Sequence, residues 1–250
     1  MNLGAICDTI VFVRPKAVYR LQSFAFTGGG WISGDKADMR PVAQFFAENG
    51  FAAFCPQYRL APLHTYPAAV EDCQAFIAYL RTNANDLQIH PEKIGAIGNS
   101  AGGYFAVMLA VCDAPINGMH TRVNAAVDVC GLTDLTHPNE KHPKISLDFI
   151  SQYMGKPFEG NEELWLEASP LYHVDENAAP LLIFHGMQDD VVLPEQSIRL
   201  YKALTSCQVK AELVIFEDEW HSFSLETFEK ILQRSLDFFS EVFEYACRPA

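Results

Sequence analysis

Short apolar segments alternate with longer amphipathic ones along the whole chain, and this alternation limits the fold more than any other feature of the sequence. The stretch from Pro67 to Leu80 is typical of the longer kind, because its apolar residues recur as on one face of a helix. Further helices are expected from Ser100 to Val111 and from about Leu225 to Ala246. The short segments predict strands at Asp8–Val13, Leu21–Phe26, Phe51–Cys55, Ile94–Ile97, Ala125–Val129, Leu181–Phe184 and Ala211–Phe216.

Strands that alternate with helices build βαβ units, which form a mostly parallel sheet with helices on both faces. We expect the 250 residues to form one α/β domain, since this length leaves no room for a second full domain. In such a sheet the reactive side chains gather beyond the carboxyl ends of the strands.

The stretch from Gly131 to Val174 interrupts the alternation. It is either a small lid-like insertion that partly covers the site or a pair of connecting helices on the flank of the sheet.

The composition is ordinary for a soluble protein with one sizeable core, with 49% hydrophobic and 20% charged residues. The formal net charge of −13 argues against a nucleic acid or an anionic membrane as partner, and favours a small neutral or cationic substrate. No apolar stretch reaches the roughly 18 residues of a spanning helix, and the first residues do not resemble a signal peptide. A cytoplasmic protein is the default expectation, and a homo-oligomer is left open.

The seven cysteines are scattered and include no CxxC pair. Most of them stand in apolar runs, as Cys55 does in FAAFC and Cys130 does in AAVDVC. Buried, reduced thiols explain this distribution better than a disulfide framework or a zinc site. We therefore expect neither a metal nor a cofactor.

The letters GNSAG at residues 98–102 form a GxSxG pattern between the expected strand Ile94–Ile97 and an expected helix. A sharp strand-to-helix turn lifts a serine hydroxyl clear of the sheet, and the two glycines remove side chains that would clash in the turn. The N-terminus of the helix also favours negative charge near Ser100. A glycine-rich turn without chemistry would share these letters, but the position between strand and helix favours a catalytic nucleophile.

A second glycine-rich turn, TGGGW at residues 27–31, follows the expected strand Leu21–Phe26. Glycines allow backbone N–H groups to approach a substrate oxygen, and fixed donors of this kind stabilise the oxyanion of a tetrahedral intermediate. We assign the donors of this oxyanion hole to Gly28, Gly29 and Ala101. A triple glycine alone is weak evidence, and its position upstream of the GxSxG pattern gives it weight.

A serine hydroxyl becomes a good nucleophile when an imidazole takes its proton and a carboxylate holds that imidazole. Among the eight histidines, His221 is the candidate base because it lies just after the last expected strand. His185 stands in an HG turn, which we interpret as support for the loop that follows. Two carboxylates come next in that loop. We assign Asp189 as the acid and keep Asp190 as the alternative. The resulting order of Ser100, acid and histidine is the order expected of an α/β-hydrolase.

Taken together, these motifs resemble those of a known family. The segments TGGGWISGDK, QYRLAP with the following YPAAVEDC, GNSAGG, HGMQDDVV and WHSF are similar to the hormone-sensitive-lipase-like and bacterial acetyl-esterase or feruloyl-esterase-like branch of the α/β-hydrolases. The similarity covers roughly residues 22–240. It implies hydrolysis of small carboxylic esters, with Ser100, Asp189 and His221 as the catalytic triad and the oxyanion hole at the donors assigned above.

Two departures from the family pattern affect the expected substrate. The family usually has histidine where this chain has Thr27, so the support behind the oxyanion hole differs. The N-terminal part is short and no large cap domain is expected, which favours short acyl groups, such as acetyl esters of carbohydrates, over bulky lipids. Two alternatives stay open. One is an arylformamidase or other small-amide hydrolase with the same triad, and the other is a non-catalytic binding protein derived from an esterase.

Overall fold

The computed structural model describes residues 10–12, 20–26 and 29–244. Within these residues a seven-stranded sheet has the order β1-β3-β2-β4-β5-β6-β7. β1 runs antiparallel to β3, and the other neighbouring strands are parallel, which confirms the mostly parallel sheet predicted from the sequence. The strands are β1 (Ile10–Phe12), β2 (Arg20–Phe26), β3 (Ala52–Cys55), β4 (Ile89–Asn99), β5 (Ala125–Val129), β6 (Leu181–Gly186) and β7 (Ala211–Phe216).

The predicted strands match the observed ones closely, and β5 and β7 agree residue for residue. The largest difference is at β4, which begins at Ile89 and not at Ile94. The residues between them are polar and include a proline, so they lack the apolar pattern of a buried strand. Their pairing with β2 is also interrupted by a register shift between Arg20 and Gln22. The two ends of the first predicted strand, at residues 8–9 and 13, lie outside the described residues.

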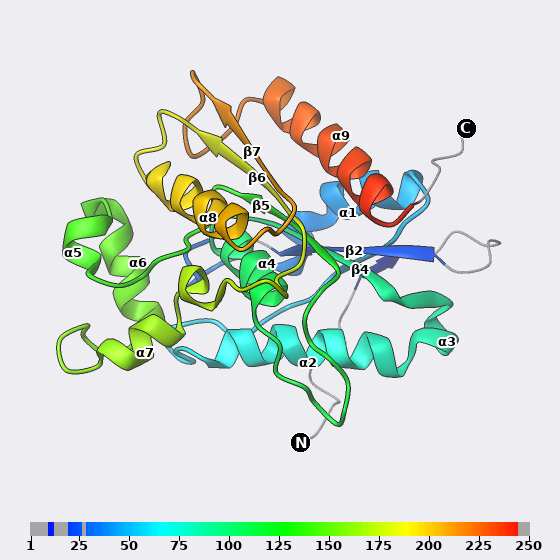
Figure 1. Ribbon diagram of the computed structural model, residues 1–250, viewed down its shortest axis with the longest axis horizontal. Coiled ribbons are helices and arrows are strands. Elements are labelled where there is room, and N and C mark those ends of the chain that lie inside the picture. The colour runs from blue at the N-terminus through cyan, green and yellow to red at the C-terminus, as the bar shows by residue number, and fades with distance from the viewer. Residues whose placement is uncertain (1–9, 13–19, 27–28, 245–250) are drawn as a thin grey trace.

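Helices cover both faces of the sheet, as the sequence predicts (Figure 1). α1 (Arg40–Glu48) and α9 (Leu225–Val242) pack on one face, while α2 (Ala68–Thr82), α4 (Ala101–Val111) and α8 (Glu195–Ser206) pack on the other. The alternation of strand side chains supplies both cores. In β3, Ala52 and Phe54 join the core beneath α2 and α4, whereas Ala53 and Cys55 join the core beneath α1 and α9.

The predicted helices agree with α2, α4 and α9 to within a few residues, although α9 ends at Val242 and the predicted end at residue 246 lies outside the described residues. Two short helical elements precede α1 and β4, respectively. They are the 3₁₀ turn η2 (Lys36–Met39) and α3 (Ala84–Leu87). In the described part of the chain, no helix combines the length and the apolar character that crossing a membrane requires.

The stretch from Gly131 to Val174 is helical and contains no strand. Asp134 fastens its beginning to the body of the protein, because its buried carboxylate accepts hydrogen bonds from Lys141 Nζ (2.6 Å) and from Arg199 Nη1 of α8 (2.5 Å). Burial raises the pKa of Asp134, but these donors and Thr136 outweigh it and hold the pKa below its ordinary value. The helices of the stretch lie together at one side of the molecule (Figure 1). They are α5 (Pro138–Lys141), α6 (Lys144–Met154), α7 (Glu162–Glu167) and the 3₁₀ turn η3 (Pro170–His173).

Phe239 anchors α9 to the sheet. Its buried ring lies over Gly95 of β4, where a Cβ atom would approach the ring to 2.6 Å, and it packs against Phe46 of α1 with ring centroids 5.8 Å apart. We expect Phe239→Ala to lower the free energy of unfolding by about 3–5 kcal/mol, because the lost contacts leave a cavity. Urea unfolding followed by circular dichroism measures this change.

Glu229→Ala is the control, because Glu229 is exposed on the same helix and its replacement should change the free energy by at most about 0.5 kcal/mol. Equal losses in the two variants would contradict the anchoring role of Phe239.

Candidate active site

Ser100 occupies the turn between β4 and α4 in a strained backbone conformation, with φ 54° and ψ −120°. Its N–H donates to the carbonyl of Val129 at the end of β5 (2.8 Å), and its carbonyl accepts the N–H of Tyr104 in α4 (3.0 Å). The turn is tight, because a Cβ atom at Gly98 would come within 2.3 Å of the backbone of Gly102. The strand–turn–helix context expected for the GxSxG pattern is therefore present, and Gly98 is needed for its close approach to Gly102.

The structure brings Ser100, His221 and Asp189 into one hydrogen-bonded line. His221 Nε2 lies 3.0 Å from Ser100 Oγ, and His221 Nδ1 lies 2.7 Å from Asp189 Oδ2. With its proton on Nδ1, the imidazole donates to the carboxylate and accepts from the serine hydroxyl. The three side chains follow β4, β7 and β6, whose carboxyl ends meet at one edge of the sheet. Asp190 is exposed, so the geometry favours Asp189 over this alternative.

The carboxylate of Asp189 is buried and receives hydrogen bonds from several sides. Its Oδ1 accepts the N–H groups of Val191 (2.9 Å) and Val192 (2.8 Å), and its Oδ2 faces the imidazoles of His221 and His185. Burial raises the pKa of this carboxyl, but the hydrogen bonds, those from the two imidazoles above all, outweigh it and hold the pKa below its ordinary range. Asp189 is therefore ionised at neutral pH and can stabilise a positive imidazole.

His185 contacts the site more directly than the sequence indicated. The sequence predicted that it supports the loop, and its Nε2 does lie 2.8 Å from the carbonyl of Val192 in that loop. The same nitrogen is 3.2 Å from Asp189 Oδ2, and Nδ1 is 2.6 Å from Ser197 Oγ of α8. His185 is fully buried. Its position at the end of an apolar strand was the one signal in the sequence that could have indicated such a contact.

Asp128 is a second buried carboxyl near the site, and no motif in the sequence indicates it. It lies on β5, and its Oδ1 accepts the N–H of Gly131 (2.9 Å), whereas Oδ2 has no hydrogen-bond partner among the described residues. A Cβ atom at Gly103 or at Gly131 would approach Oδ1 to 2.3 Å. Burial raises the pKa of Asp128 to about 7. A single aspartate in the apolar strand AAVDV was the available signal.

The predicted oxyanion hole is described only in part. Gly28 and the preceding Thr27 lie outside the described residues. Gly29 has φ 109°, a conformation that favours glycine, and a Cβ atom there would lie 2.5 Å from the carbonyl oxygen of Ser33. Ala101 is buried at the first position of α4, where a backbone N–H has no partner within the helix. Gly29 lines the same small cavity as Ser100, and Ala101 directly follows Ser100 in the chain.

Two cavities meet at His221. The smaller one measures about 210 Å³ and has Ser100 in its wall. The rest of its lining is mostly apolar and includes Trp31, Leu132, Phe149, Ile150, Val191 and Val192. Because Phe149 and Ile150 belong to α6, the helical stretch after β5 forms one wall of this cavity.

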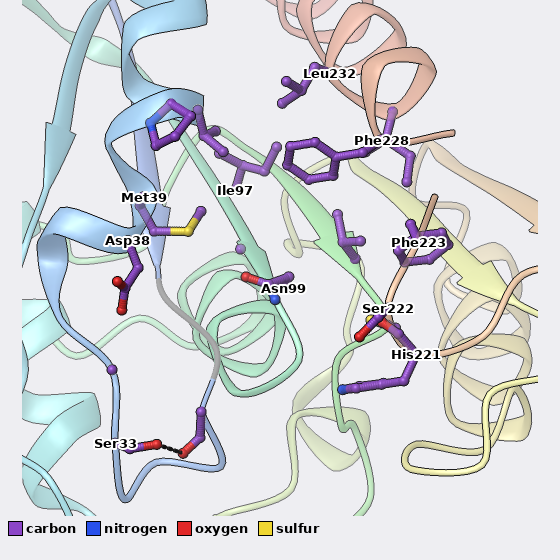
Figure 2. A pocket seen from close by; sticks show the side chains of 18 residues that line it. Ser33, Asp38, Met39, Ile97, Asn99, His221, Ser222, Phe223, Phe228 and Leu232 are labelled. Carbon is purple, nitrogen blue, oxygen red and sulfur yellow. Dashed lines mark hydrogen bonds between the residues drawn. The ribbon is translucent and has the colours of Figure 1, made fainter. Parts of the chain in front are cut away.

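The larger cavity measures about 610 Å³ and lies between η2 and α1 on one side and α9 on the other. Figure 2 shows His221 and Ser222 on one side of this cavity and Asp38 and Met39 on the opposite side, with Asn99 between them. The imidazole of His221 points into the cavity (Figure 2).

Three of the described cysteines, Cys55, Cys73 and Cys130, are buried as the sequence predicts, whereas Cys112 and Cys207 are partly exposed. Cys7 and Cys247 lie outside the described residues. Among the described residues, one group of side chains could hold a metal ion. It consists of Cys130, Asp189 and His221, whose ligand atoms lie within 4.8 Å of one another.

Comparison with known proteins agrees with the fold and the motifs. Residues 24–204 match the model of the family described as BD-FAE. The chain is similar to the probable carboxylic ester hydrolase LipM of Mycobacterium tuberculosis, with 27% identity over 213 residues, which is 81% of this chain and 49% of that protein. It is also similar to the esterase LipQ of the same organism, with 29% identity over 185 residues, which is 71% of this chain and 44% of that protein. The chain thus spans about half the length of these curated relatives.

Solved structures of similar fold include a thermophilic esterase of Thermogutta terrifontis with propionate bound, with a TM-score of 0.82 and 25% sequence identity. The matched region covers 96% of this chain and 91% of the esterase chain. Another is an acetyl ester-xyloside bifunctional hydrolase of Caldicellulosiruptor lactoaceticus, with a TM-score of 0.84 and 21% sequence identity. The matched region covers 95% of this chain and 89% of the hydrolase chain. At that identity the likeness shows the fold alone. The fold is the α/β-hydrolase fold that the sequence predicted.

Asp128 should make the stability of the protein depend on pH. Its pKa in the folded state, about 7, lies above the ordinary value of 3.8, so between these values the folded state holds a proton that the unfolded state has lost. The resulting stabilisation is present at acid pH and is lost as the pH rises through the folded value. Asp128→Asn removes this titration and keeps an oxygen for the N–H of Gly131.

We therefore compare the melting temperature of Asp128→Asn with that of the wild type at about pH 5 and at about pH 8. The difference, variant minus wild type, should be larger by at least about 2 °C at the higher pH. Calorimetry at the two pH values measures the difference, and Asp190→Asn, at an exposed carboxylate, serves as control. Wild-type and Asp128→Asn melting curves that move in parallel with pH would contradict the role of Asp128.

Proposed function

The chain belongs to the BD-FAE family, and from this premise we propose that it is a serine carboxylesterase that hydrolyses short-chain acyl esters through an acyl-enzyme on Ser100. The observation that carries the proposal is the hydrogen-bonded line from Ser100 through His221 to Asp189, with distances of 3.0 and 2.7 Å, at the wall of a small cavity. Curated relatives named as esterases support the same activity.

The first half of the proposed reaction transfers the acyl group to the enzyme. His221 Nε2 takes the hydroxyl proton while Ser100 Oγ attacks the ester carbonyl carbon. The imidazole becomes positive, and the ionised carboxylate of Asp189, 2.7 Å from Nδ1, stabilises it. The N–H groups of Gly28, Gly29 and Ala101 donate to the oxyanion. His221 then gives its proton to the alcohol oxygen as the bond between carbon and that oxygen breaks.

The second half regenerates the serine by steps of the same kind, with water as the nucleophile and Ser100 Oγ as the leaving group. A water molecule takes the place of the alcohol, and His221 removes one of its protons as the water oxygen attacks the acyl carbon. The tetrahedral intermediate collapses, the carboxylic acid leaves, and Ser100 Oγ receives the proton back from the imidazole. The reaction needs no group beyond ester, water and these side chains, so we propose no cofactor.

The size of the small cavity favours a short acyl group. Its volume of about 210 Å³ lies below the usual range of about 300–1,000 Å³ for sites that hold drug-sized ligands. A similar esterase, at 25% identity, has been solved with propionate bound. We propose that the cavity takes acyl groups such as acetyl, propionyl and butyryl. For the alcohol part we propose neutral groups such as carbohydrates, because a net charge of −13 disfavours polyanions.

The triad can be tested by replacing each member. We expect Ser100→Ala and His221→Ala each to lower kcat for p-nitrophenyl acetate by about 10⁵–10⁶-fold, and Asp189→Asn to lower it somewhat less. Asp190→Asn is the matched control and should keep near-wild-type activity, because its carboxylate is exposed. A large loss in Asp190→Asn with little loss in Asp189→Asn would show that the acid is misassigned. Faster turnover of N-formylkynurenine than of any ester would favour the small-amide hydrolase instead.

The cavity wall can be tested by opening it. Each buried methylene is worth about 0.8 kcal/mol, or roughly fourfold in kcat/KM, as long as the acyl chain fits. We expect wild-type activity to fall steeply beyond about four to six acyl carbons, and Phe149→Ala to extend this limit by about two carbons. Ile145→Ala, at an exposed position of the same helix, should leave the profile unchanged. The measurement is kcat/KM for p-nitrophenyl esters of increasing length, and a wild-type preference for decanoyl over acetyl esters would refute the proposal.

A further inference from the structure

Cys130 lies beside the hydrogen-bonded line but has no part in the proposed reaction. It directly follows β5, and its N–H donates to the carbonyl of Phe184 in β6 (2.8 Å), which fixes its backbone. Its thiol is buried and lies 3.8 Å from the carbonyl oxygen of His221. The Sγ atom, a carboxylate oxygen of Asp189 and a ring nitrogen of His221 all lie within 4.8 Å of one another. Three different metal-binding groups therefore converge on one point.

Thiolate, imidazole and carboxylate are the three side-chain groups that bind zinc in proteins, at about 2.0–2.3 Å from the ion. Three protein ligands with a water molecule in the fourth position complete a tetrahedral site. We propose that Cys130, Asp189 and His221 form an inhibitory site for Zn²⁺ and for softer cations such as Cd²⁺. Hard cations such as Mg²⁺ and Ca²⁺ prefer oxygen ligands and should not bind there.

The larger cavity gives a cation a route to this site. Cys130 and His221 both line it, and the third ligand, Asp189, lies outside its lining but within 4.8 Å of these two. The cavity volume of about 610 Å³ leaves room for a water ligand on its side of the site. In Figure 2 the imidazole of His221 points into this cavity, so the cavity side of the ring can meet an ion. Ser100 lines the small cavity and not this one, so a cation can reach Cys130 and His221 without passing Ser100.

Metal binding would break the line from Ser100 to Asp189. The thiol, which burial keeps protonated by raising its pKa well above the ordinary value, must release its proton to solvent when sulfur binds the ion. The imidazole likewise uses one ring nitrogen for the metal. It can then no longer accept from Ser100 Oγ at 3.0 Å while donating to Asp189 at 2.7 Å. Hydrolysis would stop although the protein stays folded.

The test compares inhibition in three matched proteins. We expect Zn²⁺ and Cd²⁺, but not Mg²⁺ or Ca²⁺, to inhibit hydrolysis of p-nitrophenyl acetate by the wild type, and EDTA to reverse the inhibition. Cys130→Ala should raise the half-inhibitory Zn²⁺ concentration at least about tenfold and leave the metal-free rate within about twofold. Cys55→Ala is the control, because Cys55 is also a buried thiol in the core beneath α1 and α9, and its inhibition should equal that of the wild type. If the alanine variant folds poorly, Cys130→Ser, which keeps the shape of the side chain, is measured in its place with the same expected result.

A direct measurement separates this proposal from the proposed esterase activity. Co²⁺ bound to a thiolate gives a sulfur-to-cobalt charge-transfer absorption, which requires no turnover. We expect this band in the wild type and in Ser100→Ala, and its loss in Cys130→Ala and in His221→Ala. The band with no esterase activity in the wild type would support the metal site and refute the proposed function. Zn²⁺ inhibition that is unchanged in Cys130→Ala and Cys130→Ser would overturn the metal site.

Discussion

The buried carboxylate of Asp189 is the interaction on which the candidate site depends. An isolated negative charge at this depth would be costly, and two backbone N–H groups and two imidazoles offset that cost. These donors tie separate elements together. The N–H groups of Val191 and Val192 fold the loop after β6 around the carboxylate, His221 brings in the loop after β7, and His185 links the carboxylate to Ser197 of α8. One charge thus orients both the imidazole that faces Ser100 and the loops that line its cavities.

The wall of the small cavity that contains Trp31 rests on aromatic packing. Trp31, which follows the glycine-rich turn, stacks on Tyr153 of α6 with ring centroids 4.4 Å apart and meets the edge of Tyr104 of α4 at 5.3 Å. The three rings therefore join the glycine turn, the helix that begins after Ser100 and the helical stretch after β5. Phe149 packs where a side chain at Gly30 would stand. Asp134 fixes the other end of the same stretch through Arg199 of α8. These contacts tie the stretch to the glycine turn, to α4 and to α8.

The sequence predicted the parts of this arrangement that local pattern determines. The strand and helix around Ser100, and the placement of Asp189 and His221 after β6 and β7, follow from apolar periodicity and turn glycines. The order of these elements in the sheet then brings the side chains together. What the sequence could not predict depends on contacts between distant segments. Nothing near His185 indicates that α8 supplies Ser197, and nothing in AAVDV shows that Asp128 is left with one donor. The double role of the stretch after β5, which both lines the cavity and packs on the flank, likewise exists only in three dimensions.

Asp128 and Asp189 show how such contacts decide the charge of a buried group. Both are fully or nearly fully buried aspartates, on neighbouring strands or just beyond them, and both lie near His185. Asp189 accepts three hydrogen bonds and also faces His185 Nε2 at 3.2 Å, and its pKa falls below the ordinary range, so it is ionised where the proposed reaction needs a negative charge. Asp128 receives one, from Gly131, and burial raises its pKa to about 7. When Asp128 is neutral, Asp189 carries the negative charge that faces His185. Burial raises the pKa of both groups, but the donors around Asp189 and the charge of His221 outweigh it there, and the loop after β6 supplies two of these donors.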